Sequence, residues 1–334
     1  MDNIIEISNV SIHFPIEKGI LKKVVGVVRA VDDVSLFIPR GTTMGLVGES
    51  GSGKTTLGRA ILQGYKLTTG SIFFNDDKNN LRIDNIKRKE FKYIRKNIQM
   101  IFQDPFSSLD PRKTVLDIIS EPLKINFSLS KKNIESKVLD ILDLVGLDKK
   151  YLKRFPHAFS GGQRQRIGIA RALVMNPKFI ICDEAVSALD VSVQAQILNL
   201  LKELQKEFNL TYLFIAHDLS VVEYISDMIA VMYLGEIIEI RKKNTIFQKP
   251  LHPYTEGLIR SIPLPNIYNK FIDKEILKGE IPLISKNIKG CYFHNRCSYK
   301  KDICLTKRPA LEKKGDMTYV SCHFSDNLNL KGIQ

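Results

Sequence analysis

Residues 43–63 read TMGLVGESGSGKTTLGRAILQ, and this stretch decides the fold class of the chain. Its centre, Gly48 to Thr55, fits the pattern Gly-x-x-x-x-Gly-Lys-Ser/Thr of a phosphate-binding P-loop. A strand-like apolar segment, 43–47, precedes the loop, and a helix-like segment, 56–63, follows it. A glycine-rich turn in this context directs backbone N–H groups at phosphate oxygens, and the helix N-terminus adds partial positive charge. The stretch therefore predicts an α/β domain that binds a nucleotide.

The residues expected to contact ATP lie in the loop and directly after it. Lys54 places a positive charge on the phosphates, and the hydroxyl of Thr55 is a candidate ligand of Mg²⁺. The alternative, a glycine-rich surface turn, does not require Lys-Thr after the last glycine. The candidate ATP-binding residues of this segment are Gly48, Glu49, Ser50, Gly51, Ser52, Gly53, Lys54, Thr55 and Thr56.

Length and composition allow a large core, since 44% of the 334 residues are hydrophobic. No apolar run reaches the roughly 18 residues that a membrane span needs. The N-terminus carries no basic region followed by an apolar stretch, so we expect no secretory signal and a cytosolic chain. The net charge of +14 fits a solvated Lys-rich surface, an anionic membrane surface or nucleic acid, and charge alone does not choose among them.

Strand-like and helix-like segments alternate along the chain, which predicts an α/β sheet covered on both faces. We expect short strands at 4–14 and 34–38, separated by a basic insertion at 17–29. Further strands are expected at 98–102, 179–182 and 211–216, and helical segments at 115–147, 164–175 and 191–208. After residue 243 periodicity is lost and prolines recur, at positions 250, 253, 263, 265 and 282. We therefore place a domain boundary at residue 243.

Further polar motifs follow the P-loop in a fixed order. Gln103 ends a strand, Ser160-Gly161-Gly162-Gln163 precedes a helix, and FIICDE at 179–184 is an apolar strand that ends in two carboxylates. Ser187-Ala188-Leu189-Asp190 follows, and His217 ends the next strand. This order resembles the ATP-binding cassette (ABC) ATPases over residues 4–243. The resemblance implies a P-loop NTPase (RecA-like) core, an antiparallel β subdomain and an α-helical subdomain at about 104–176, with a loop-rich extension at 244–334.

The expected catalytic residues are Lys54, Glu184 and His217, and Gln103 and Asp183 join Thr55 as expected Mg²⁺ ligands. Asp183, at the carboxyl end of a buried strand, is expected to hold Mg²⁺ through water, and Glu184 to deprotonate the attacking water. By resemblance, Gln103 is the Q-loop residue that contacts Mg²⁺ and senses the γ-phosphate. His217 resembles the switch histidine that hydrogen-bonds the γ-phosphate, and Asp190 belongs to the D-loop.

The segment Ser160, Gly161, Gly162 and Gln163 predicts a second anion site, because glycines at a helix N-terminus leave N–H groups free. In the resembling family, each ATP lies between the P-loop of one subunit and this signature segment of its partner. Phe14 resembles the aromatic residue that stacks on adenine; a core-facing Phe is the alternative. Phe159 and Ala185 depart from the usual Leu and Pro, and neither position touches phosphate.

Longer segments narrow the resemblance to the ATPases of oligopeptide and dipeptide importers. FQDPFSSLDPR at 102–112, AVSALDVSVQAQ at 185–196 and HPYT at 252–255 are similar to segments of those proteins, and residues 18–32 resemble their F-type subunit. The implied partners are a D-type ATPase paralogue, two transmembrane permease subunits and, indirectly, an extracellular substrate-binding protein, with no nucleic acid. The implied location is the cytoplasmic face of the membrane.

Two alternative functions remain at this point. The same machinery imports nickel or glutathione in related systems, and this chain carries no feature that selects the cargo. A soluble ABC ATPase of DNA repair or translation is the more distant alternative. The single P-loop and the lack of an inserted coiled coil argue against that class.

Five cysteines are present, and Cys182 stands alone in an apolar stretch, as a buried core residue does. The other four follow the pattern Cys291-x5-Cys297-x6-Cys304-x17-Cys322, which lacks the Cys-x2-Cys pairs usual in zinc ribbons. Four thiolates suit a [4Fe–4S] cluster, and resemblance to the importer subfamily implies one on this spacing. Zinc and free buried thiols remain alternatives, and His294 and His323 are expected to be neighbours rather than ligands.

Overall fold

The computed structural model describes residues 2–19, 23–77, 79–262 and 288–333. Its contacts divide the chain into two compact units. The helical unit comprises residues up to 4, 38–43 and 74–215, and the P-loop unit comprises 5–37, 44–73 and 216–334. Part of the predicted insertion, 20–22, and the prolines at 263, 265 and 282 lie outside the described residues.

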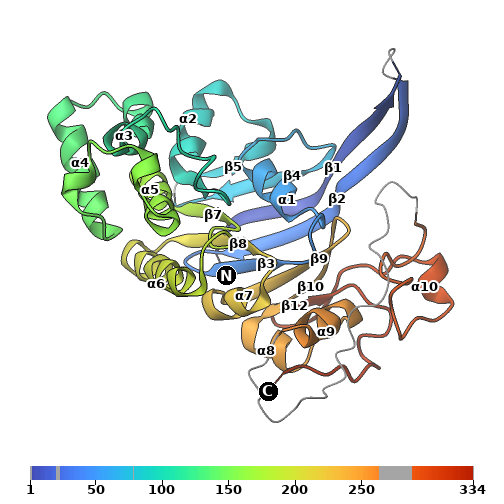
Figure 1. The fold of residues 1–334 in the computed structure, drawn as a ribbon. Helices are drawn as coiled ribbons and strands as arrows, with labels where there is room; N and C mark the ends of the chain where they lie inside the picture. Colours follow the sequence, from blue (N-terminus) through green and yellow to red (C-terminus); the bar gives the residue numbers. More distant parts are fainter. Residues whose placement is uncertain (1, 20–22, 78, 263–287, 334) are drawn as a thin grey trace, which may run out of the picture. The chain divides into compact units, whose positions relative to one another are not determined.

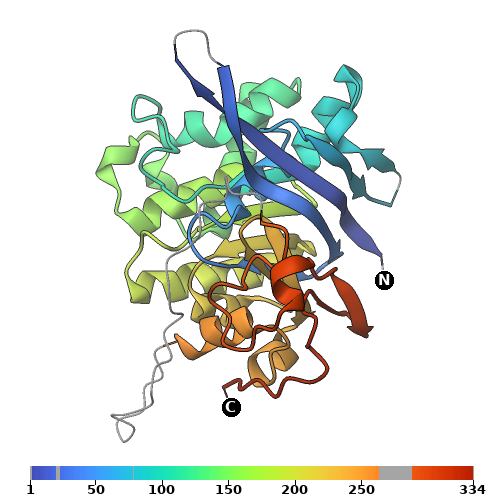
Figure 2. The same ribbon diagram turned by 90° about the vertical axis from the view of Figure 1, so that its right-hand side faces the viewer.

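Two long strands, β1 (Asn3–Lys18) and β2 (Lys23–Pro39), form a ribbon in the P-loop unit, side by side in Figure 2. β1 is hydrogen-bonded to β2 on one side and to β4 (Thr69–Asn75) on the other. The prediction of two short strands was wrong, because both strands continue through most of the expected insertion. Val24, Val25 and Val27 explain the difference, since β-branched residues favour an extended backbone.

The second sheet of the P-loop unit combines parallel and antiparallel strands. β3 (Thr43–Val47) pairs in parallel with β9 (Met228–Tyr233), with Met44 opposite Met228. β9 pairs antiparallel with β10 (Glu236–Lys242), and β10 pairs antiparallel with β12 (Thr318–Val320), as Figure 1 shows. β11 (Glu312–Gly315) pairs with β12, so the C-terminal extension adds two strands that the sequence did not predict.

The helices of the P-loop unit follow its strands at short intervals. The loop before α1 is the P-loop, and α7 follows the strand that ends at Ala216. Within its described residues, the extension contributes α8, α9 and α10, which are labelled in Figure 1. The bounds are α1 (Lys54–Ile61), α7 (Leu219–Ile225), α8 (Lys243–Gln248), α9 (Pro253–Arg260) and α10 (Ile303–Thr306).

In the helical unit, three buried strands run parallel: β6 (Ile98–Ile101), β7 (Phe179–Asp183) and β8 (Thr211–Ala216). They lie at the predicted places because continuous apolar runs suit strands that are covered on both faces. The helices are α2 (Arg88–Asn97), α3 (Val115–Asn126), α4 (Lys131–Leu144), α5 (Gly161–Leu173) and α6 (Val191–Phe208). The unit also holds β5 (Asn80–Arg82) and 3₁₀ turns at 83–85, 149–151 and 156–158.

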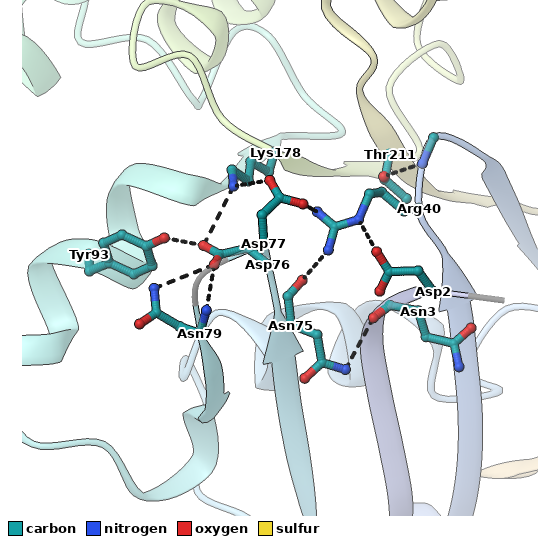
Figure 3. A network of polar contacts seen from close by, with 11 residues as sticks. Asp2, Asn3, Arg40, Asn75, Asp76, Asp77, Asn79, Tyr93, Lys178 and Thr211 are labelled. Carbon is teal, nitrogen blue, oxygen red and sulfur yellow. Dashed lines mark hydrogen bonds and ion pairs between the residues drawn. The ribbon is translucent and has the colours of Figure 1, made fainter.

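A polar network joins distant segments of the helical unit (Figure 3). Arg40 pairs with Asp2 at 2.7 Å and with Asp77 at 3.5 Å, and it donates to the carbonyl of Asn75 at 3.2 Å. Lys178, just before β7, reaches Asp77 at 3.2 Å, and this hydrogen bond lowers the pKa of that carboxyl. The network therefore anchors the start of the chain to the segment that leads into β7.

None of the helices within the described residues combines the length and the apolar composition that crossing a bilayer requires.

Candidate functional site

The P-loop closes around its own lysine. Lys54 is 5% exposed, and its Nζ donates to the carbonyls of Gly48 at 2.8 Å and Glu49 at 2.9 Å and to the hydroxyl of Ser52 at 3.3 Å. These oxygen contacts hold the ammonium group inside the loop. A positive charge is therefore placed at the centre of the loop, where the sequence predicted phosphate binding.

Two glycines of the P-loop have no possible substitute at their positions. Gly48 has φ 153°, and a Cβ there would lie 2.1 Å from the carbonyl oxygen of Met232. Gly53 has φ 103°, and its Cβ would lie 2.1 Å from the carbonyl oxygen of Ala30. Both the backbone conformation and the space exclude a side chain, so the motif glycines are required by the packing of the P-loop unit.

The remaining positions of the P-loop and the start of α1 differ in their exposure to solvent. Ser50 and Gly51 are exposed, whereas Thr55 and Thr56 are half-buried in the first turn of α1. The expected adenine-stacking residue, Phe14, is 36% exposed, and its ring meets the ring of Tyr65 edge-on at 5.3 Å. The sequence reasoning missed Tyr65, whose only signal is an aromatic residue shortly after α1.

The acidic residues lie at the end of β7 in the helical unit. Asp183 is the last residue of the strand and is 1% exposed. Glu184 follows in the left-handed region with φ 48°, and its N–H donates to the carbonyl of Ile215 at 2.9 Å. Its own carbonyl accepts from the N–H of Ser187 at 3.1 Å and from the hydroxyl at 3.0 Å. Strained backbone of this kind persists at functional sites, where the surrounding contacts over-determine it.

The structure brings Gln103 and Glu184 together, a contact that the sequence did not predict. Nε2 of Gln103 donates to Oε2 of Glu184 at 2.7 Å. The amide oxygen of Gln103 takes no part in this contact. Carboxylate, amide and hydroxyl oxygens are the donors that Mg²⁺ prefers, so Asp183, Gln103 and Thr55 have the chemistry that the ion requires.

The signature segment caps the N-terminus of α5. The hydroxyl of Ser160 accepts from the N–H of Gln163 at 3.4 Å, and the side chain of Gln163 accepts from the N–H of Ser160 at 3.1 Å. Ser160 is exposed, while a Cβ on Gly162 would lie 2.4 Å from Val193. Close packing against α6 therefore requires a glycine, and Ser160 stays accessible at the helix end.

Asp190 and His217 each lie close to the start of a helix in their own unit. Asp190 caps α6 by accepting from the N–H of Val193 at 3.0 Å, and hydrogen bonds from Ser192 and from Val193 lower its pKa. His217 is exposed and follows β8 directly, two positions ahead of α7. Both side chains therefore lie at the surface of the described residues.

The four C-terminal cysteines, Cys291, Cys297, Cys304 and Cys322, line one small cavity in the P-loop unit. Burial, followed by the neighbouring thiols, raises the pKa of Cys291 to about 12 and that of Cys297 to about 11. Among the described residues, no group of three or more His, Cys, Asp and Glu side chains could hold a metal ion. The cysteines thus converge on one cavity without the geometry of a single-ion site.

The histidines beside this cavity use ring nitrogens for contacts with the backbone. Nδ1 of His294 lies 2.6 Å from the carbonyl oxygen of Cys291, and Nε2 of His323 lies 2.9 Å from that of Lys307. His252, also on the cavity wall, accepts from the N–H of Tyr254 at 3.0 Å, and burial lowers its pKa to about 3. Cys182, the fifth cysteine, is fully buried within β7.

Two residues of the extension that sequence reasoning missed contact the P-loop. The hydroxyl of Tyr254 accepts from the N–H of Glu49 at 2.8 Å, and Arg296 pairs with the carboxylate of Glu49 at 2.6 Å. No local pattern marks either residue, because the contacts of Tyr254 and Arg296 join positions 205 and 247 apart in the chain. The extension therefore reaches the P-loop at Glu49.

Family comparisons match two parts of the chain. Residues 31–187 match the ABC transporter family, and residues 238–304 match the family described as oligopeptide/dipeptide transporter, C-terminal region. The first match includes the P-loop, Gln103, the signature segment and Glu184. The second includes Tyr254, Arg296 and three of the four clustered cysteines.

Individual proteins are similar over longer stretches. The oligopeptide transport ATP-binding protein AppF of Bacillus subtilis (strain 168) is 48% identical over 96% of this chain and 97% of its own. The glutathione import ATP-binding protein GsiA of Pectobacterium atrosepticum is 47% identical over 84% of this chain and 44% of its own. A dimeric post-hydrolysis structure of the ATP-binding cassette MJ0796, bound to ADP and Pi, has a TM-score of 0.62 and 28% identity, and covers 72% of this chain and 98% of that one.

Proposed function

The chain belongs to the ABC transporter ATPases that carry the oligopeptide/dipeptide transporter C-terminal region, and on this premise we propose that it powers the uptake of oligopeptides or dipeptides. It is an ATP-hydrolysing subunit of an importer, and membrane permease subunits are its partners. The assignment of peptides as the cargo rests on the 48% identity to AppF, which extends over nearly the whole length of both chains. We propose the cytoplasmic face of the membrane as its location.

We propose that the nucleotide-binding domain spans residues 1–243, with the helical subdomain at about 104–176, and that the extension spans 244–334. In this domain the P-loop N–H groups and Lys54 bind the phosphates, and Phe14 stacks on adenine. Thr55, Gln103 and Asp183 would hold Mg²⁺, which neutralises charge on the phosphates when it is bound.

We assign the chemical step to Glu184, which takes a proton from the attacking water. The hydrogen bond from Gln103 and the contacts of the Glu184 backbone hold that carboxylate in one orientation. His217 donates to the γ-phosphate, and Asp190 belongs to the loop that reports on the partner cassette. In this assignment water attack occurs only when the γ-phosphate is present to order these groups.

We propose that Ser160, Gly161, Gly162 and Gln163 act on the nucleotide of a partner cassette. The exposed hydroxyl of Ser160 at the start of α5 supports this role, because a helix N-terminus attracts phosphate. The related cassette MJ0796 is dimeric with ADP and Pi bound. We propose a D-type paralogue as the partner, so that two cassettes close on ATP and separate after hydrolysis.

We propose that the permease docks on the segment after Gln103 in the helical unit. Phe102 is 40% exposed and Phe106 is 59% exposed, which makes them prominent apolar side chains on that surface. The guanidinium group of Arg164 lies 4.0 Å from the centre of the Phe106 ring. A surface of aromatic rings backed by arginines suits a partner helix.

We propose a [4Fe–4S] cluster in the cysteine cavity. The support is that Cys291, Cys297, Cys304 and Cys322 line the same cavity and offer four sulfur donors, the usual ligand set of such a cluster. Burial raises the pKa values of Cys291 and Cys297, which keeps these two free thiols protonated near neutral pH, so metal binding must displace their protons. A cluster held by these thiolates would tie the loops of the extension together.

Uptake of labelled peptides by cells that lack this gene tests the proposed cargo. We expect loss of uptake of peptides, restored by the wild-type gene and not by a Glu184→Gln variant. Labelled glutathione and nickel are measured in parallel, because the similarity to GsiA keeps glutathione as the second candidate. Normal peptide uptake together with lost glutathione uptake would reject the peptide assignment and retain the ATPase.

A further inference from the structure

Glu49, the second residue of the P-loop motif, is held through three of its groups. Its N–H donates to the hydroxyl of Tyr254 at 2.8 Å, and its carbonyl accepts from Nζ of Lys54 at 2.9 Å. Its carboxylate accepts two hydrogen bonds from Arg296, at 2.6 and 2.9 Å. Two of these three anchors come from the C-terminal extension, so the extension holds the conformation of the loop at Glu49.

Arg296 is built to stay in place. Its side chain is 4% exposed, and its guanidinium group lies 5.9 Å from the ring centres of both Tyr233 and Phe293. The ring of Tyr254 meets those of Tyr233 and Phe293 at 4.6 and 5.4 Å. A two-pronged ion pair on a buried aromatic base keeps one geometry, because the planar guanidinium group loses little freedom when it binds.

The loop that carries Arg296 is also the loop between the first two clustered cysteines. The N–H of Arg296 donates to the carbonyl of Phe293 at 3.0 Å, and the N–H of Cys291 donates to the carbonyl of Cys304 at 2.9 Å. Cys297 is the next residue after Arg296 and lines the cysteine cavity. A rearrangement of the cysteines therefore moves the guanidinium group that binds Glu49.

A second connection runs from the extension to the other side of the P-loop. The hydroxyl of Tyr292 donates to Asp32 at 2.8 Å, and Arg308 donates to the same carboxylate oxygen at 3.2 Å. Asp32 lies two positions after Ala30, whose carbonyl lies against Gly53. The extension thus supports the loop near both of its ends.

We propose that Arg296 is a positioning residue for ATP binding: it holds the P-loop through Glu49 and makes nucleotide affinity depend on the cysteine-rich extension. Tyr254 acts with it by fixing the N–H of Glu49. Loss of either contact releases the loop, and Lys54 then has to be ordered by the nucleotide itself. The inference rests on the ATPase function of the chain, whereas the identity of any metal in the cysteine cavity is a separate question.

The test measures KM for ATP and kcat for the full-length chain combined with its partner cassette, and the affinity of the chain alone for a fluorescent ATP analogue, all after anaerobic purification. We expect Arg296→Ala and Tyr254→Phe each to raise KM and the dissociation constant about fivefold or more, while kcat changes by less than about twofold. Arg296→Lys keeps the charge and loses the two-pronged contact, so its KM should lie between those of wild type and Arg296→Ala.

Matched controls come from the same extension. Lys313→Ala removes an exposed cation of β11, and Tyr319→Phe removes a hydroxyl from β12, and both should keep the wild-type KM. In a double-mutant cycle, Glu49→Gln combined with Arg296→Ala should be no worse than Glu49→Gln alone. Iron content and melting temperature are recorded for every variant.

Wild-type KM in Arg296→Ala and Arg296→Lys, or effects that add fully in the cycle, would overturn the inference. If Arg296→Ala does not fold, Arg296→Lys and Tyr254→Phe decide the question, because both preserve most of the packing. A wild-type complex with the partner cassette that binds the ATP analogue without hydrolysing it would instead reject the ATPase function, and the dissociation constants would still test the role of Arg296.

Discussion

The side-chain amide of Gln103 donates a hydrogen bond from Nε2 to Oε2 of Glu184 across 2.7 Å, although 81 positions separate the two residues. One residue follows the strand β6, and the other follows the neighbouring parallel strand β7. Parallel strands bring their carboxyl ends to one edge of a sheet, where side chains from separate loops meet. The contact therefore fixes the carboxylate that we assign as the base.

The first prediction concerns this carboxylate. Glu184→Gln removes the proton acceptor and keeps the size of the side chain, so kcat for ATP hydrolysis should fall by at least about a hundredfold. ATP binding should persist, and an ATP-bound pair with the partner cassette should accumulate. Phosphate release and gel filtration with ATP measure the two effects. Unchanged steady-state hydrolysis would contradict the assignment of Glu184 as the base.

The second prediction tests action across a pair of cassettes. Ser160→Arg should lower kcat by about a hundredfold or more and leave the affinity of the isolated chain for ATP unchanged, because the segment serves the nucleotide of the partner. Lys54→Ala should weaken ATP binding by the chain itself. Ser130→Arg is the matched control, since Ser130 is an exposed N-cap serine of α4 in the same unit. Equal loss of ATP affinity in Ser160→Arg and Lys54→Ala would argue against the shared site.

The third prediction concerns the cysteine cavity. Anaerobically purified chain should contain about four iron and four sulfide per chain, with broad absorbance near ~400 nm. Serine at Cys291, Cys297, Cys304 or Cys322 should abolish the absorbance, whereas Cys182→Ser should retain it, because Cys182 lies in the core strand β7. Stoichiometric zinc in place of iron would reject the cluster and keep the cavity as a metal site.

The fourth prediction is a pH dependence of stability in the P-loop unit. Burial raises the pKa of Glu239 from 4.5 to about 7, and the N–H groups of Leu251 and His252 each donate to its carboxylate at 2.9 Å. Because the folded pKa is the higher one, the stability from this group is full below pH ~4.5 and is lost as pH rises through about 7. By pH 8, the contribution of Glu239 to the free energy of unfolding has fallen by roughly 3 kcal/mol.

Urea unfolding at pH 5 and pH 8 measures this effect. Wild type should lose free energy of unfolding between the two values, and Glu239→Gln should show a smaller loss, even though its own stability is lower at pH 5. Glu312→Gln, which changes an exposed carboxylate on β11, should retain the wild-type dependence. If Glu239→Gln loses as much free energy of unfolding between pH 5 and pH 8 as wild type, other groups cause the pH dependence. Glu236 is then the first candidate, since burial raises its pKa to about 8.

Local pattern predicted the core elements closely. The expected helix at 191–208 and strand at 211–216 have those bounds in the structure, because amphipathic spacing and continuous apolar runs are local signals. Local signals failed where the secondary structure of a segment depends on pairing with another strand. β11 is a short, exposed, Lys-rich segment that becomes a strand only through pairing with β12, and the three-residue β12 becomes a strand only through pairing with β10.

By itself, the sequence determined that the chain binds and hydrolyses a nucleotide. A P-loop needs Gly48, Gly53, Lys54 and Thr55 at set positions, and a strand that ends in Asp183 and Glu184 carries its chemistry within consecutive residues. Only the tertiary structure decided that the extension holds the P-loop. Arg296 pairs with the carboxylate of Glu49, and the hydroxyl of Tyr254 accepts a hydrogen bond from the N–H of Glu49. Contacts between residues more than two hundred positions apart depend on the path of the whole chain, and no local periodicity encodes that path.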